Sequence, residues 1–176
     1  MITVKDKTFV PFLDPTRLQT RIDVLARQIN DDYKGKMPVF IVVLKGAFLF
    51  ASDLFKHVTV PCEITFVRLA SYQQMESSGK IKQIIGLDTP IENRHVIIVE
   101  DIVDTGLTMA QLVAQLKSQG PASVEVATLL HKPDATREAV DIRYTGFEIA
   151  NRFVVGYGLD YDEQGRNLDA IYVLAD

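Results

Sequence analysis

Apolar residues recur at helical spacing in the segment that follows Leu13. Asp14 followed by Pro15 is typical of a helix start, because aspartate caps the first turn and proline is tolerated at its first position. The apolar positions that share one face are Leu18, Ile22, Leu25, Ala26 and Ile29. This spacing predicts an amphipathic helix.

Continuous apolar runs rich in β-branched residues predict buried strands at residues 38–44, 62–69, 95–100 and 123–130. Helical patterns lie between them, at residues 47–57 and from residue 107 to a stop at Gly120-Pro121. Two shorter strands fit residues 152–158 and 170–176. Buried strands that alternate with helices predict an α/β fold with a mostly parallel, twisted sheet flanked by helices.

Composition narrows the class of protein. The 176 residues suit a single domain over residues 1–176, and the net charge of −4 supplies no basic stripe for nucleic acid. The lone Cys62 excludes an internal disulfide and favours a reducing compartment. The first residues lack a signal-peptide core, and no apolar run is long enough to cross a membrane. We therefore expect a cytoplasmic protein with no nucleic-acid or membrane partner.

Polar residues follow directly after several predicted strands. They are Lys45-Gly46, Ser71-Tyr72, the segment from Glu100 to Thr108, and His131-Lys132. In parallel sheets, ligands bind beyond the carboxyl ends of the strands. We expect these segments to converge on one rim, with the polar stretch 71–80 as a loop that closes over reactants.

The segment 99–112, VEDIVDTGLTMAQL, combines an acidic cluster with a small, hydroxylated loop. Thr105, Gly106 and Thr108 lead into a helix and leave N–H groups and hydroxyls free to bind a phosphate. Neither a P-loop nor a dinucleotide fingerprint is present, because Tyr161 stands where the latter needs its third glycine. Glu100 and Asp101 suit ribose hydroxyls or a divalent cation, so the segment predicts a phosphorylated sugar as ligand.

Segment 99–109 resembles the signature of phosphoribosyltransferases, which bind 5-phosphoribosyl 1-pyrophosphate (PRPP), and other segments resemble the hypoxanthine-guanine branch of that family. They are LKGAFLF (44–50), RLASYQQ (68–74), LLHK (129–132), GFEIANRFVVGYGLDY (146–161) and Arg166, in the family's order. The resemblance implies the type I phosphoribosyltransferase fold, with a small hood made by the C-terminal part of the chain. It also implies transfer of a phosphoribosyl group from PRPP to N9 of a 6-oxopurine, with Mg²⁺ as cofactor.

The resemblance assigns a role to each rim residue. Asp104 matches the group that takes or shares the proton at purine N7, and it joins Thr105, Gly106, Leu107 and Thr108 around the 5′-phosphate. The other implied roles are Lys45, Gly46 and Arg166 for pyrophosphate; Ser71 and Tyr72 for the mobile loop; Lys132, Phe153, Val154 and Asp160 for the purine; Glu100 and Asp101 for the ribose; and Glu100, Asp101 and Asp160 for metal. In family members the peptide bond at the position of Leu44 and Lys45 can be cis. Leu107 departs from several relatives, which carry a basic residue there.

Each residue also has a structural interpretation. The acidic cluster could be a solvated turn and helix cap, Lys132 a turn residue before Pro133, and Phe153 a core residue. Lys132 can only donate hydrogen bonds, so it suits a 6-oxo group and rejects the amino group of adenine. Two alternatives to a hypoxanthine-guanine enzyme remain: a xanthine-preferring enzyme, or a non-catalytic PRPP-sensing regulator, which would need a basic face. The family resemblance implies a homodimer or homotetramer.

Overall fold

A computed structural model of the chain describes residues 1–71 and 81–175. Its elements run in the order β1 (Ile2–Val4), β2 (Lys7–Leu13), α1 (Pro15–Asp32), β3 (Val39–Leu44), α2 (Phe48–His57), β4 (Glu63–Ser71), β5 (Ile81–Ile85), β6 (His95–Val103), α3 (Leu107–Lys117), β7 (Ser123–His131), the short 3₁₀ helix η1 (Pro133–Ala135), β8 (Tyr144–Glu148), β9 (Val154–Val155) and β10 (Ile171–Leu174). No helix in these described ranges is long and apolar enough to span a membrane.

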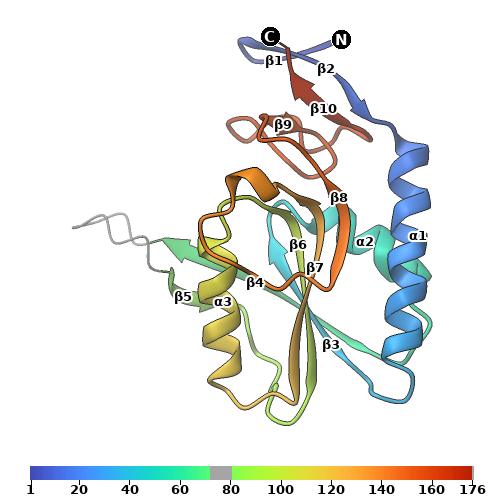
Figure 1. Cartoon of the computed structure of the whole chain (residues 1–176), viewed down its shortest axis with the longest axis vertical. Coiled ribbons are helices and arrows are strands. Elements are labelled where there is room, and N and C mark those ends of the chain that lie inside the picture. Colours follow the sequence, from blue (N-terminus) through green and yellow to red (C-terminus); the bar gives the residue numbers. More distant parts are fainter. Residues whose placement is uncertain (72–80, 176) are drawn as a thin grey trace.

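The larger sheet is the α/β core that the hydrophobic pattern predicts. Its strand order is β5-β4-β3-β6-β7-β8, and every neighbouring pair is parallel except β5 with β4. Alternate residues of β3 are buried on both faces: Phe40 packs in the cluster with α1 and α2, and Ile41 packs in the cluster with α3. The fold class is confirmed, with helices on both faces of a mostly parallel sheet (Figure 1).

The helices begin and end close to where the pattern predicts. In α1 the Asp14 carboxylate accepts a hydrogen bond from the backbone N–H of Arg17 at 2.9 Å, and Pro15 occupies the first turn. All five predicted inward residues of this helix are buried. The third helix starts at Leu107 and ends at Lys117, shortly before Gly120. Capping chemistry and helical period, both readable from sequence, therefore set these boundaries.

The second sheet, which we call the hood, has the order β1-β2-β10-β9 and is antiparallel throughout. It lies at one end of the molecule together with both chain termini (Figure 1). The prediction that the C-terminal part of the chain makes the hood is correct for β9 and β10 but incomplete, because β1 and β2 supply the other two strands. The hydrophobic pattern did not predict β2, because Pro11 is unusual within a strand. The pairing of β2 with β10 accommodates this proline by a register shift between Ile171 and Tyr172.

Several other strand boundaries differ from the predicted ones. The predicted strand 152–158 shortens to Val154–Val155, and β5 and β8 were not predicted at all. β6 extends to Val103, so Glu100 and Asp101 belong to the strand itself and not to the loop after it. Pairing with β7 continues as far as Val103 opposite His131, and this pairing holds the acidic segment in extended conformation.

Candidate active site

The carboxyl ends of β3, β6 and β7 are adjacent because these strands are neighbours in the sheet. Lys45 follows β3, Asp104 follows β6 and Lys132 follows β7. Ser71 is the last residue of β4, while Tyr72 and the rest of the predicted closing loop, 72–80, lie outside the described residues. The predicted convergence at one rim thus holds for the described segments that follow these three strands.

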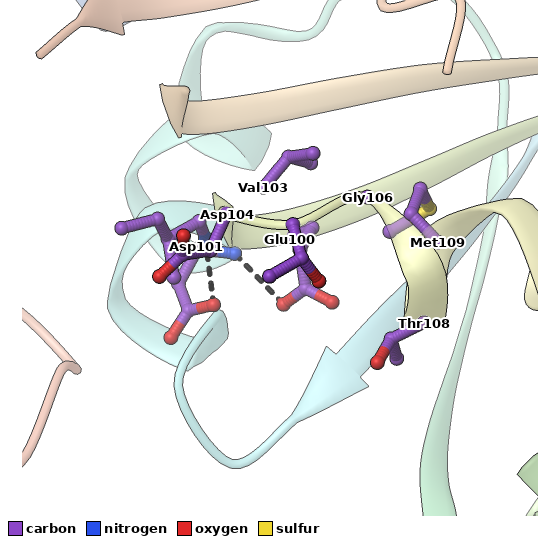
Figure 2. Close-up of a pocket in the computed structure, with 9 residues that line it drawn as sticks. Glu100, Asp101, Val103, Asp104, Gly106, Thr108 and Met109 are labelled. Atoms are coloured by element: carbon purple, nitrogen blue, oxygen red, sulfur yellow. Dashed lines mark hydrogen bonds between the residues drawn. The ribbon is translucent and has the colours of Figure 1, made fainter. Parts of the chain in front are cut away.

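Glu100 and Asp101 form a buried carboxylate pair at the end of β6. The backbone N–H of Asp101 donates to Glu100 Oε1 at 3.0 Å, and the N–H of Ile102 donates to Asp101 Oδ1 at 2.7 Å (Figure 2). Burial raises the pKa of Glu100 well above its usual range, and the charge of Asp101 raises it further. Burial also raises the pKa of Asp101, although Arg166 opposes this shift. Two buried acids with raised pKa values form a site where a cation or hydroxyl donors would be stabilising.

The loop after β6 lines a pocket of about 170 Å³ with Glu100, Asp104, Gly106 and Thr108 at its wall (Figure 2). Gly106 has φ 81°, and a Cβ there would meet the backbone oxygen of Glu138 at 2.2 Å, so only glycine fits. Among the described residues, no side chain caps α3 at Gly106. The positive end of this helix therefore faces the pocket with backbone donors available to an anion.

Asp104 and Lys132 meet across the ends of β6 and β7. Lys132 Nζ lies 3.1 Å from Asp104 Oδ2, and the backbone N–H of Lys132 donates to Val103 O at 3.0 Å. Lys132 is 6% exposed, which excludes the interpretation as an ordinary turn residue. A buried ammonium beside a half-exposed carboxylate offers a donor and an acceptor side by side at the rim.

A second group of charges surrounds Lys45. The peptide bond between Leu44 and Lys45 is cis. Lys45 Nζ contacts Glu163 Oε2 at 2.8 Å, and this hydrogen bond lowers the pKa of Glu163. Arg166 Nη2 contacts Asp160 Oδ1 at 2.8 Å and Glu163 Oε2 at 3.6 Å. The two cations predicted to bind pyrophosphate are thus bridged by one carboxylate.

Close backbone contacts join this charge group to the acidic strand. A Cβ on Gly46 would lie 1.6 Å from Asp101 Oδ2, and a Cβ on Gly158 would lie 2.0 Å from Gly46 O. Arg166 Nη1 donates to Gly158 O at 2.9 Å. Among the described residues, the buried Nε of Arg166 has no hydrogen-bond partner. The loop between β9 and β10, the loop after β3 and the end of β6 are therefore in close contact, and Lys45 and Arg166 lie where they meet.

Phe153 and Val154 are placed in the hood by β9. Phe153 is 43% exposed, so it is not a core residue, and its ring lies 6.2 Å from that of Phe9 and 5.9 Å from that of Tyr161. Val154 is buried and its backbone pairs with Val173. An exposed ring held by two others is a suitable platform for a flat heterocycle.

Two positioning features were missed by sequence reasoning. One is Glu163, whose signal was its place three residues before Arg166. The other is Tyr157, whose hydroxyl donates to Asp53 Oδ2 at 2.5 Å and so ties the hood to α2. Gln19 of α1 also donates to this carboxylate, at 2.7 Å. No local pattern marks contacts between residues more than a hundred positions apart.

Comparison with known proteins shows the family of this chain. The model of the phosphoribosyl transferase domain matches residues 13–162. The hypoxanthine-guanine phosphoribosyltransferase of Mycobacterium bovis is 46% identical over 169 residues, which cover 92% of this chain and 84% of the relative. The corresponding protein of Bacillus subtilis is 40% identical over 158 residues, covering 89% of this chain and 88% of the relative.

Solved structures give the same result. A hypoxanthine phosphoribosyltransferase from Staphylococcus aureus superposes with a TM-score of 0.88 at 39% identity, covering 94% of this chain and 91% of that one. The hypoxanthine phosphoribosyl transferase of Trypanosoma cruzi gives a TM-score of 0.89 at 36% identity, covering 99% and 95%. By domain, by sequence and by structure, this chain belongs to the phosphoribosyltransferase family.

Proposed function

We propose that this protein is a purine-salvage enzyme that transfers the 5-phosphoribosyl group of PRPP to N9 of hypoxanthine or guanine. The products are IMP or GMP and pyrophosphate. The observation that carries the choice of base is the contact of Asp104 with Lys132, 3.1 Å apart at the rim. The hypoxanthine-guanine names of the relatives from Mycobacterium bovis and Bacillus subtilis support the same assignment.

The Asp104–Lys132 pair fits one edge of a 6-oxopurine. N7 and O6 lie next to each other on that edge, and both are acceptors in guanine unless N7 carries a proton. Lys132 donates to O6, and Asp104 accepts from a protonated N7. Adenine presents an amino group in place of O6, so its donor would face the buried ammonium of Lys132. The pair therefore selects a 6-oxo base and fixes the orientation of its ring.

In the reaction, N9 attacks C1 of the ribose and the bond from C1 to the pyrophosphate oxygen breaks. The proton on N7 passes to Asp104, which keeps the purine ring electron-rich as its new bond forms. Positive charge develops on the ribose, and the buried carboxylates of Glu100 and Asp101 would stabilise it. Phe153 stacks on the purine, and backbone carbonyls near Val154 and Asp160 accept from the 2-amino group of guanine.

The donor is held by the other rim segments. Thr105, Gly106, Leu107 and Thr108 surround the 5′-phosphate at the start of α3. Leu107 is 42% exposed, and the phosphate is bound by backbone donors there in place of a basic side chain. Lys45, Gly46 and Arg166 bind the pyrophosphate. The buried Nε of Arg166, which has no hydrogen-bond partner among the described residues, is a further donor for it. The proposed closing loop, to which we assign Ser71 and Tyr72, starts where β4 ends at Ser71, and its other residues lie outside the described ranges.

Magnesium fits the carboxylate pair. Within residues 1–71 and 81–175, no group of three or more His, Cys, Asp or Glu side chains could hold a metal ion by itself. Two acids whose pKa values are raised by burial would hold an ion that takes its other ligands from water and substrate oxygens, as Mg²⁺ does. Mg²⁺ would offset charge on the pyrophosphate, and Asp160 is a candidate for a second ion.

The assembly and location follow from the same assignment. We propose a single domain over residues 1–176 that forms a homodimer or homotetramer in the cytoplasm. A xanthine-preferring enzyme is not favoured, although a relative from Tritrichomonas foetus, 43% identical, is named a hypoxanthine-guanine-xanthine phosphoribosyltransferase. A non-catalytic regulator that binds nucleic acid would need a basic face, which a net charge of −4 does not favour.

A steady-state assay with PRPP, Mg²⁺ and each of hypoxanthine, guanine, xanthine and adenine tests the proposal. We expect turnover of hypoxanthine and guanine and none of adenine. Asp104→Asn, which keeps the shape but accepts no proton, should lower kcat about 10²- to 10⁴-fold while changing PRPP affinity much less. Absence of turnover with every 6-oxopurine would refute the enzyme, and unchanged turnover in Asp104→Asn would refute its proton role.

A further inference from the structure

Glu163 contacts both cations that the proposed function assigns to pyrophosphate. Its Oε2 lies 2.8 Å from Lys45 Nζ and 3.6 Å from Arg166 Nη2. We propose that Glu163 is a displaceable counter-ion that competes with pyrophosphate for Lys45 and Arg166. This inference rests on the proposed function of those two cations and adds a residue that controls how tightly the pyrophosphate group is held.

The chain places Glu163 there by means of a tight turn. Asp162 and Glu163 have φ of 49° and 66°, the left-handed region that L-residues seldom adopt. The Asp160 carboxylate accepts a hydrogen bond from the backbone N–H of Glu163 at 2.8 Å, and Tyr161 pairs with Gln164 across the turn. Two consecutive residues in an unfavourable conformation, fastened at both sides, hold this carboxylate at the two cations.

The ion pairs of Glu163 are weak enough to be exchanged for a ligand. The side chain of Glu163 is 64% exposed and that of Lys45 is 52% exposed, so water screens their attraction. Arg166 is held independently by Asp160 and by Gly158 O, and it keeps its place when Glu163 leaves. Pyrophosphate carries more negative charge than a single carboxylate, so it displaces Glu163 from the two cations. Because the displacement costs free energy, pyrophosphate binds less tightly than it would without Glu163.

The displaced side chain has space to occupy. Glu163 and Arg166 also line a pocket of about 620 Å³ between β1, the start of α2 and the loop that follows Glu163. Thr3 and Phe48 form part of its opposite wall. The carboxylate can therefore leave the two cations without unfolding the turn that carries it. Its return would then help to expel pyrophosphate once the ribosyl group has been transferred.

Calorimetric titration of Mg²⁺-pyrophosphate into the whole protein, at fixed low ionic strength, tests this competition. Glu163→Gln removes the negative charge that attracts Lys45 and repels phosphate. We expect a Kd about five-fold lower, which is the size of an exposed ion pair. Asp162→Asn is the matched control: it removes the same charge one residue away, on a side chain that pairs with Lys5. Its Kd should change less than two-fold.

The outcomes separate this inference from the proposed function. A gain in affinity cannot arise from misfolding, so it supports competition; an unchanged or higher Kd in Glu163→Gln overturns it. In a Lys45→Met background the gain should fall below two-fold, and a retained five-fold gain would also overturn it. If the wild-type protein neither binds Mg²⁺-pyrophosphate nor turns over a 6-oxopurine, the proposed function itself fails.

Discussion

Lys132→Met is the sharpest test of how the protein selects its base. Methionine keeps the unbranched stem, which is buried at 6% exposure, but it removes the ammonium that lies 3.1 Å from Asp104 Oδ2. The O6 atom of hypoxanthine or guanine then faces a thioether that cannot donate a hydrogen bond. A hydrogen bond from a charged donor contributes about 1.5–3 kcal/mol, so KM for both bases should rise about 10- to 150-fold.

Adenine is the informative competitor in this variant. In the wild-type protein its amino group would meet a second donor, whereas methionine removes that conflict. The ratio of kcat/KM for hypoxanthine over adenine should therefore fall by at least the factor lost in KM. Asp104 is half exposed and becomes solvated when its partner is removed, so the thermal midpoint should move by only a few degrees.

The assay is steady-state kinetics with hypoxanthine, guanine and adenine at saturating PRPP. Lys117→Met, at the exposed last turn of α3, is a control for loss of one lysine charge away from the rim. The reasoning is refuted if Lys132→Met keeps its KM for both 6-oxopurines and still rejects adenine as strongly as before. A parallel change in Lys117→Met would show a non-specific charge effect and would also refute it.

Three further predictions concern Gly46, Glu100 and Tyr144. Gly46→Ala would put a Cβ 1.6 Å from Asp101 Oδ2 and so displace this carboxylate. We expect kcat/KM to fall about 100-fold. Activity within two-fold of wild type would contradict this. Burial raises the pKa of Glu100, so the stability of the fold falls as pH rises from the usual glutamate pKa toward the raised one. In buffer free of divalent cations, Glu100→Gln should therefore raise the thermal midpoint at pH 7.5 and weaken PRPP binding. A lower midpoint would refute this reasoning. The Tyr144 hydroxyl donates to Asp32 Oδ2 at 2.7 Å and lowers the pKa of Asp32, so Tyr144→Phe should cost about 0.5–1 kcal/mol at pH 7. That loss should vanish in urea titrations as pH falls through the lowered pKa of Asp32, with catalysis unaffected; a pH-independent loss would contradict it.

Much of the fold could be predicted from sequence because its signals are local. The continuous apolar run of β3 indicates a strand buried on both faces, the period of 3.6 in α1 reports which face is buried, and the Asp14-Pro15 pair marks where α1 begins. The strand–helix alternation then favours a parallel sheet. The hood was predicted only in part, since β2 contains Pro11 and the edge strands are short, so their partners cannot be recognised before the chain folds.

The places of Lys45, Asp104 and Lys132 could likewise be predicted, because each comes directly after a strand of the core. Their pairings could not. Lys132 meets Asp104 only because β6 and β7 are neighbours, and Glu163 reaches Lys45 only because the hood folds back over the end of β3. Sequence by itself thus determined the α/β class, the position of the acidic segment and of the small hydroxylated loop after it, and the set of residues available for chemistry. Only the tertiary structure decided which charged side chains are in contact. Contacts between segments far apart in the chain depend on the order of the strands and on how the hood packs against the core, and local periodicity carries no information about either.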